Sequence, residues 1–127
     1  MRAVLDTSVL IGGETIPAGI ETSISAISIS ELHFGLLVAG DDEARALRAA
    51  RLGLIEARFP NPLPLDDRVA RALGRLKATV AQRGGQPRRR VADLAIAATA
   101  MVHGAILISA DIEDLKLVSD LVEVRRA

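Results

Sequence analysis

The sequence predicts an α/β fold in which helices cover both faces of a mostly parallel sheet of about five strands. Short, entirely apolar runs of strand length alternate along the chain with longer segments of helical periodicity. Strands that are apolar at every position are typical of sheets buried on both faces, and strands that alternate with helices pair in parallel. The expected strands are 3–5, 24–27, 62–65, 106–108 and 121–124.

Two helices are expected in the first half of the chain. The segment 28–38 opens with Ser28, a residue type that favours helix N-termini. The segment 42–58 begins with acidic residues and then has an amphipathic pattern. Its predicted apolar face carries Leu47, Ala50, Leu54 and Arg58.

Two further helices are expected in the second half. The segment 90–102 follows a Gly-Gly-Gln-Pro turn, is apolar on nearly every side and ends near Gly104, so we expect it to be buried. The segment 67–82 has a stripe that is typical of helix packing, and we expect most of the stripe to lie in the core rather than in an interface between proteins. This stripe consists of Val69, Leu73, Leu76 and Val80.

Length and composition fit a single domain that spans residues 1–127, because no proline- or serine-rich linker interrupts the chain. There is no cysteine, which excludes disulfides, thiolate zinc sites and cysteine nucleophiles and suggests a reducing, cytoplasmic environment. An acid follows only three apolar residues at the N-terminus, so no signal peptide is expected. No apolar run approaches the roughly 20 residues that span a bilayer, so we expect no membrane segment.

Charge and aromatic content restrict how a nucleic acid can be bound. Lys plus Arg and Asp plus Glu each number 16, so the net charge neither indicates nor excludes a polyanionic partner. Phe34 and Phe59 are the only aromatic residues, which argues against a platform for base stacking. A nucleic acid, if one is bound, must therefore be held by its backbone.

Four acidic residues occupy comparable positions in the predicted fold. Asp6 directly follows the first strand, Glu31 lies in the first turn of the helix after the second strand, and Asp111 shortly follows the fourth. Asp93 lies in the first turn of the apolar helix. Taken singly, each has a structural explanation: Asp6 caps a helix, Glu31 forms a capping box with Ser28, and the others favour helix N-termini.

Their shared position favours a functional explanation. The carboxyl ends of parallel strands meet at one edge of a sheet, where α/β proteins bind ligands. Two carboxylates about 4 Å apart repel by roughly 4 kcal/mol at an effective dielectric constant near 20, so four of them require a counter-charge. Oxygen ligands alone select Mg²⁺ or Mn²⁺. The only histidines, His33 and His103, lie in apolar helical segments and are expected to be structural rather than zinc ligands.

Four segments carry a family resemblance: 4–8 (VLDTS), 27–35 (ISISELHFG), 93–100 (DLAIAATA) and 107–114 (LISADIED). Together they resemble the PIN-domain family and, within it, the VapC-type toxins of bacterial toxin-antitoxin pairs. The resemblance implies a three-layer α/β/α sandwich and an endoribonuclease that cleaves RNA phosphodiesters with water activated by Mg²⁺ or Mn²⁺. It also implies a homodimer and inhibition by a cognate VapB-type antitoxin whose C-terminal segment reaches the active site.

The resemblance also identifies candidate site residues. Asp6, Glu31 and Asp93 match the family's three acids. At the fourth position the family often has Asn or Asp, then Asp or Glu three residues later, then Phe. This chain has Asp111, Asp114 and a leucine there, which leaves open which of the two acids dominates. We favour Asp111 as the ligand and Asp114 as its support.

The expected roles follow from metal-assisted hydrolysis by one or two ions. Asp6 and Asp93 are the expected direct ligands. Glu31 is either a further ligand or the base that accepts a proton from the attacking water, and Asp111 binds a second ion or binds through water. Hydroxyl groups beside these acids either orient them or only cap helices, and they belong to Thr7, Ser8 and Ser109.

Arg88, Arg89 and Arg90 stand just before Asp93. We expect them to bind RNA phosphates or acidic groups of the antitoxin near the site. The alternative is a solvated loop without a partner.

Two other functions compete with a ribonuclease. One is a catalytically silent PIN-like module that binds RNA or a protein, although a binder of polyanions would gain by losing the four acids. The other is an enzyme that cuts DNA flaps, but the sequence has no additional helical arch or basic arm. Neither a glycine-rich phosphate loop nor a nucleophile-elbow motif is present, which argues against nucleotide switching and serine hydrolysis.

Overall fold

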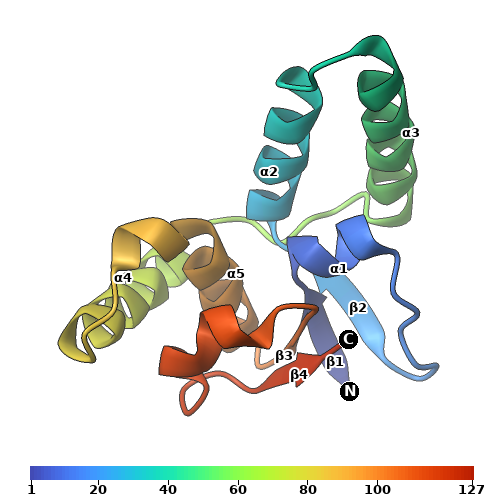
Figure 1. Ribbon diagram of the computed structural model, residues 1–127. Coiled ribbons are helices and arrows are strands. Elements are labelled where there is room, and N and C mark those ends of the chain that lie inside the picture. Colours follow the sequence, from blue (N-terminus) through green and yellow to red (C-terminus); the bar gives the residue numbers. More distant parts are fainter.

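Four short parallel strands form the centre of the structure, a computed structural model that describes residues 1–127 (Figure 1). Their order across the sheet is β2 (Glu21–Ile24), β1 (Arg2–Leu5), β3 (Ile106–Ser109) and β4 (Val124–Arg126). All three pairings are parallel, so the carboxyl ends of the strands lie at one edge of the sheet. The predicted α/β class is confirmed.

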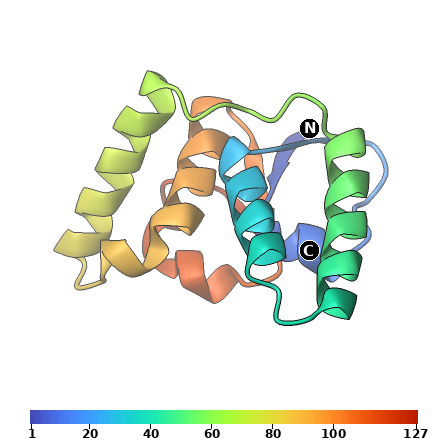
Figure 2. The ribbon, with the colours of Figure 1, turned by 90° about the horizontal axis from the view of Figure 1, so that it is seen from above.

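Helices cover the two faces of this sheet and make a three-layer arrangement (Figure 2). One face carries α4 (Asp67–Gln82), α5 (Val91–Val102) and the 3-10 helix η2 (Ile112–Val118). A short 3-10 helix, η1 (Pro87–Arg90), leads into α5. The other face of the sheet carries α1 (Thr7–Gly12), α2 (Ala26–Leu37) and α3 (Asp42–Arg58).

None of the helices combines the length and apolar character that crossing a membrane requires.

The alternation of side chains along β1 and β3 divides the core into two clusters. Val4 and Leu107 pack with Leu76 in the cluster under α4 and α5. Leu5 and Ile108 belong to the cluster under α1, α2 and α3. Both faces of these strands are buried, which is why the corresponding sequence runs are apolar at every position.

The strand expected at 62–65 is reduced to a single bridge. Leu63 pairs with Ser25, and its N–H and C=O form hydrogen bonds of 2.8 Å to the backbone on either side of that residue. The neighbours Pro62 and Pro64 carry no N–H and cannot extend the ladder. The sheet therefore has four strands, and the expected number of about five was approximate.

Two other predicted strands lie a few residues away from their expected positions. The expected strand 24–27 is observed as β2, which ends at Ile24, because Ser25 Oγ accepts a hydrogen bond from Ile27 N at 3.1 Å and caps α2. Likewise, the expected strand 121–124 is observed as β4, which begins at Val124. An apolar run by itself does not distinguish a strand from the start of a buried helix.

Helix α3 has the predicted bounds, but its predicted core face was wrong. Leu47 is 68% exposed and Leu54 is 75% exposed, whereas the buried side chains are Leu52 and Ile55. The element that α3 contacts most is α2, and the side of α3 that carries Leu47 and Leu54 faces solvent (Figure 1). Helix α4 also has the predicted bounds, and its stripe is confirmed as core: Val69, Leu76 and Val80 are buried and Leu73 is partly buried.

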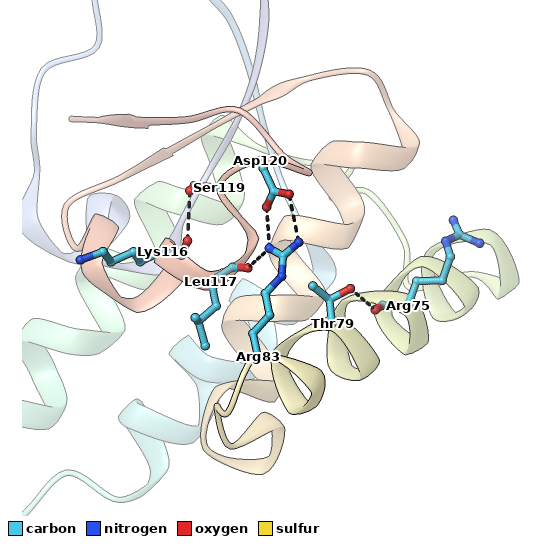
Figure 3. A network of polar contacts seen from close by, with 7 residues as sticks. All are labelled: Arg75, Thr79, Arg83, Lys116, Leu117, Ser119 and Asp120. Carbon is cyan, nitrogen blue, oxygen red and sulfur yellow. Dashed lines mark hydrogen bonds and ion pairs between the residues drawn. The ribbon is translucent and has the colours of Figure 1, made fainter.

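Arg83, directly after α4, holds η2 against this helix (Figure 3). Its Nη1 donates to Leu117 O at 2.6 Å and to Asp120 Oδ1 at 2.7 Å, and its Nη2 donates to Asp120 Oδ2 at 3.1 Å. Gly85 lies nearby, and a Cβ atom at this position would come within 2.6 Å of Leu117 Cδ1. The position of η2 matters because Asp111 and Asp114 lie at its N-terminal end.

Candidate active site

Three strands end level with one another at one edge of the sheet. Leu5 is in register with Ile24 of β2 and with Ile108 of β3. Asp6 follows β1 at this edge, and α1 and α2 begin there. The parallel register therefore brings together segments that are about a hundred residues apart, as between Asp6 and Ser109, whose side chains form a hydrogen bond.

Asp6 is almost fully buried, and three donors hold its carboxylate in one orientation. Oδ1 accepts from Thr7 N at 2.8 Å, while Oδ2 accepts from Ser8 Oγ at 3.0 Å and from Ser109 Oγ at 2.7 Å. The two serine oxygens in turn accept backbone N–H groups, those of Ala110 and Asp111. Each serine therefore donates its hydroxyl hydrogen to the Asp6 carboxylate. Asp6 caps α1, and its carboxylate is also held in a fixed orientation before any ligand binds.

Glu31 is positioned by Thr7 rather than by a capping box. Thr7 Oγ1 donates to Glu31 Oε1 at 2.6 Å. Because that hydrogen bond uses the only hydroxyl hydrogen of Thr7, the 2.9 Å contact between Thr7 Oγ1 and Ser28 Oγ must have Ser28 as the donor. Helix α2 begins before Ser28, so the capping box that the sequence suggested does not form.

Asp93 lies partly buried in the first turn of α5 and has no hydrogen-bond partner for its carboxylate. Burial, followed by the negative charge of Asp6, raises the pKa of Asp93 from 3.8 to about 6. The charges of Asp114 and Glu31 contribute to this rise in pKa, and the positive charge of Arg90 opposes it. The structure therefore places these acids close enough to alter the ionisation of Asp93.

Asp111 and Asp114 differ in exposure and in their partners. Arg90 forms an ion pair with Asp114, and this hydrogen bond lowers the pKa of the Asp114 carboxyl. A hydrogen bond to Asp114, together with the negative charge of Asp114, raises the pKa of the exposed Asp111. Asp114 is also the member of the pair whose charge acts on Asp93. The expectation that Asp111 is the main ligand stays a prediction.

The supporting residues predicted from the sequence divide into two groups. All three predicted hydroxyls, those of Thr7, Ser8 and Ser109, contact Asp6 or Glu31. Of the three arginines, only Arg90 turns toward the acids, whereas Arg88 and Arg89 are exposed and form no ion pair. The histidines lie elsewhere: His33 Nε2 contacts Glu56 Oε1 at 2.9 Å, and His103 follows the far end of α5.

Sequence analysis did not predict the arginines of α3 that border Glu31. Arg48 and Arg51 line a hollow that also contains Glu31. They are three residues apart, as are Arg45 and Arg48, so the sequence carried a signal in the repeated spacing of arginines on one side of a helix. Only the structure shows that this side faces the site.

Comparison with known proteins identifies the family. The family model for the PIN domain matches residues 3–120. The chain belongs to the PIN-domain family. Among curated relatives of this PIN domain, Ribonuclease VapC4 of Mycobacterium tuberculosis is 36% identical over 116 residues, which cover 87% of this chain and 86% of the relative. Ribonuclease VapC8 of the same species is 37% identical over 103 residues, covering 78% and 90% respectively.

Solved structures agree with this assignment. VapBC-5 from Mycobacterium tuberculosis, described as a member of the VapBC family of toxin-antitoxin systems, is similar with a TM-score of 0.81 and 32% identity. The match covers 98% of this PIN domain and 96% of that chain. A DNA-bound VapBC from Salmonella typhimurium has a TM-score of 0.77 at 18% identity and supports the fold alone. The predicted PIN-like sandwich is confirmed.

Proposed function

We propose that this PIN domain is a metal-dependent endoribonuclease and the toxin of a VapBC-type toxin-antitoxin pair. The observation that carries the proposal is the carboxylate of Asp93, which has no partner and whose pKa is raised to about 6 by burial and by neighbouring acids. A bound cation would remove this unfavourable interaction. The relatives named as VapC ribonucleases support RNA as the substrate, at 36% and 37% identity.

The acids fit a hard divalent cation by chemistry, although their present conformations are not those of a closed metal site. All the candidate donors are carboxylate oxygens, which suit Mg²⁺ or Mn²⁺. No three acidic or histidine side chains lie close enough to hold one ion together. Asp6 is fixed by its three donors, while Asp93 has no hydrogen bond to break. We therefore expect metal binding to move the side chain of Asp93 toward Asp6, while the side chain of Asp6 stays in place.

In this proposal Asp6 and Asp93 hold the ion, and Glu31 either ligates it or takes a proton from the attacking water. Glu31 Oε1 already accepts from Thr7, which leaves Oε2 for the water. When bound, Mg²⁺ or Mn²⁺ lowers the pKa of water and neutralises charge on the phosphate. Asp111 would serve a second ion or a water-mediated contact. Arg90 limits repulsion by neutralising Asp114.

The proposed partners are a cognate VapB-type antitoxin and a second copy of the chain. The VapBC complexes among the similar structures support the antitoxin. Apolar side chains exposed on the α2 and α3 pair provide surface for such contacts. They are Phe34, Leu37, Val38, Leu47 and Leu54.

A cleavage assay with antitoxin-free protein tests the proposal. Structured RNA and DNA are incubated with the parent, with Asp6→Asn and with Asp93→Asn, in Mg²⁺, in Mn²⁺ and in EDTA. We expect the parent to cut RNA only with metal, and both variants to lose activity by a factor of a hundred or more, roughly what mutagenesis of catalytic groups costs. Glu113→Gln is the matched control, because Glu113 is exposed and makes no side-chain hydrogen bond.

Two results would contradict this proposal. Cutting in EDTA, or variants as active as the parent, would exclude catalysis by a metal held on these acids. Binding of RNA without cutting under any metal condition would instead favour the catalytically silent module.

A further inference from the structure

A second hollow adjoins the acids on the side of α3. It is lined in part by Glu31 and has a volume of about 340 Å³. Its walls come from α1, α2 and α3, which meet beside the acid site. The lining residues are Ile11, Glu31, Leu32, Gly35, Arg48 and Arg51.

The two arginines of this hollow have no acidic partner. Both are partly buried, and neither forms an ion pair. Arg48 Nη1 donates to the backbone oxygen of Gly35 at 2.6 Å, while Arg51 Nε is buried without any acceptor. By contrast, Arg45, three residues before Arg48 on the same helix, pairs with Asp42.

A buried guanidinium N–H without an acceptor is unfavourable, so an anion that enters the hollow and draws the Arg51 guanidinium toward it would supply hydrogen bonds that Arg51 lacks. The planar fork of a guanidinium matches the oxygens of a phosphate or a carboxylate. With Arg48 beside Arg51, the hollow presents two cations to an anion of that kind.

The neighbouring acids favour a phosphate of the substrate as that anion. A polyanion that approaches Asp6, Glu31 and Asp93 is repelled unless cations lie along its path. Arg90 does not serve this purpose, because it is already paired with Asp114. Arg51 borders Glu31 in the hollow, so an anion bound there lies beside the proposed site of cleavage.

We propose that Arg48 and Arg51 bind a backbone phosphate of the RNA next to the phosphate that is cleaved. This inference rests on the proposed ribonuclease function. The exposed Arg88 and Arg89 lie on η1, across α2 from α3 (Figure 2). A bound RNA strand would therefore meet cations on both sides of the acids.

The test measures RNA binding and its salt dependence. Arg48→Gln/Arg51→Gln is made in an Asp6→Asn background, which prevents cleavage, and binding of random-sequence single-stranded RNA is followed by fluorescence anisotropy in Mg²⁺. Each lost phosphate contact should reduce the slope of log K against log salt by about 0.7. We expect affinity at low salt to fall roughly tenfold or more. Arg45→Gln is the matched control, since it removes the same charge from the same helix outside the hollow.

A second measurement uses otherwise unmodified protein and the RNA that it cuts best. Arg51→Gln should raise KM with little change in kcat, because a contact beside the cleaved bond acts on ground state and transition state alike. Arg51→Lys should recover part of this loss, since it restores the charge without the fork. Thermal unfolding verifies that each variant is folded.

The outcomes separate this inference from the function on which it rests. If the parent cuts RNA and the double variant binds RNA with the affinity and salt slope of Arg45→Gln, the phosphate site is overturned and the ribonuclease stands. If the double variant binds RNA as Arg45→Gln does but loses binding to the antitoxin, the phosphate site is also overturned, and the hollow binds a carboxylate of that protein. A parent that neither cuts nor binds RNA overturns both proposals.

Discussion

Replacing Asp93 with asparagine should stabilise the metal-free protein at neutral pH. The pKa of Asp93 is raised from 3.8 to about 6, chiefly by burial. Each tenfold change in proton affinity corresponds to about 1.4 kcal/mol, so this shift sets an upper limit of about 3 kcal/mol on the cost of ionised Asp93. Asp93 is only partly buried, so screening by solvent reduces this cost to about 1–2 kcal/mol. Its favourable position at the N-terminus of α5 offsets about 0.3–1 kcal/mol more. The net gain expected for Asp93→Asn is about 1 kcal/mol.

The pH dependence follows from the direction of this pKa shift. Well below pH 3.8, Asp93 is protonated in both the folded and the unfolded state, so the parent and Asp93→Asn should differ little. As the pH rises from 4 through 6, the unfolded chain releases this proton before the folded one does, and the parent loses stability. Above about pH 7 the difference between the two proteins should be complete.

Urea unfolding in EDTA between pH 4 and 8 measures this difference, with Glu113→Gln as the control for loss of one acid. Mg²⁺ or Mn²⁺ should then stabilise the parent and not Asp93→Asn, because only a folded chain that binds metal is stabilised by it. A parent as stable as Asp93→Asn at pH 7.5 in EDTA, or a difference that does not vary with pH, would refute the electrostatic reasoning.

Three other substitutions, with Gly74→Ala as a comparison for the first, test how the site is supported. Gly85→Ala should destabilise the fold by about 1–3 kcal/mol in urea unfolding, because its Cβ would lie 2.6 Å from a side-chain carbon of η2; Gly74→Ala, with open space around it in α4, should gain about 0.5–1 kcal/mol. Arg83→Gln should lower the melting temperature only slightly, because exposed ion pairs contribute little, but should speed amide hydrogen exchange in η2 above all. Ser109→Ala removes a buried donor to Asp6 and should cost about 2 kcal/mol in urea unfolding and weaken Mn²⁺ binding about tenfold or more. Unchanged exchange in η2, or unchanged Mn²⁺ affinity, would exclude the corresponding supporting role.

Much of the fold could be predicted because the pattern of apolar residues within each segment shows which of its positions are buried. The bounds of α3 and α4 were predicted correctly, and the apolar runs marked β1 and β3. The prediction failed where backbone chemistry overrides hydrophobicity. Pro62 and Pro64 reduce a strand to one bridge, and Ser25 ends β2 by capping α2.

The acids could be predicted as a group, because each follows a strand or begins a helix at the same edge. Their individual environments could not. Thr7 accounts for the orientation of Glu31, and it lies 24 residues away along the chain. The pairing of Arg90 with Asp114 depends on how η2 packs against α4 and α5. No local pattern encodes such a contact.

The sequence by itself determined the class of the fold, the edge of the sheet at which the candidate acids lie and the identity of Asp6, Glu31 and Asp93 as candidate acids. The fold class and the shared edge follow from the period of apolar residues and from the order of strands and helices, whereas the choice of these three acids follows from the motifs that resemble the PIN-domain family. Only the tertiary structure decided that Asp114 rather than Asp111 acts on Asp93, that the leucines of α3 face solvent, and that two unpaired arginines stand beside Glu31. These features depend on the angles and distances between packed elements, and a small rotation of one helix would change them without changing the pattern of the sequence.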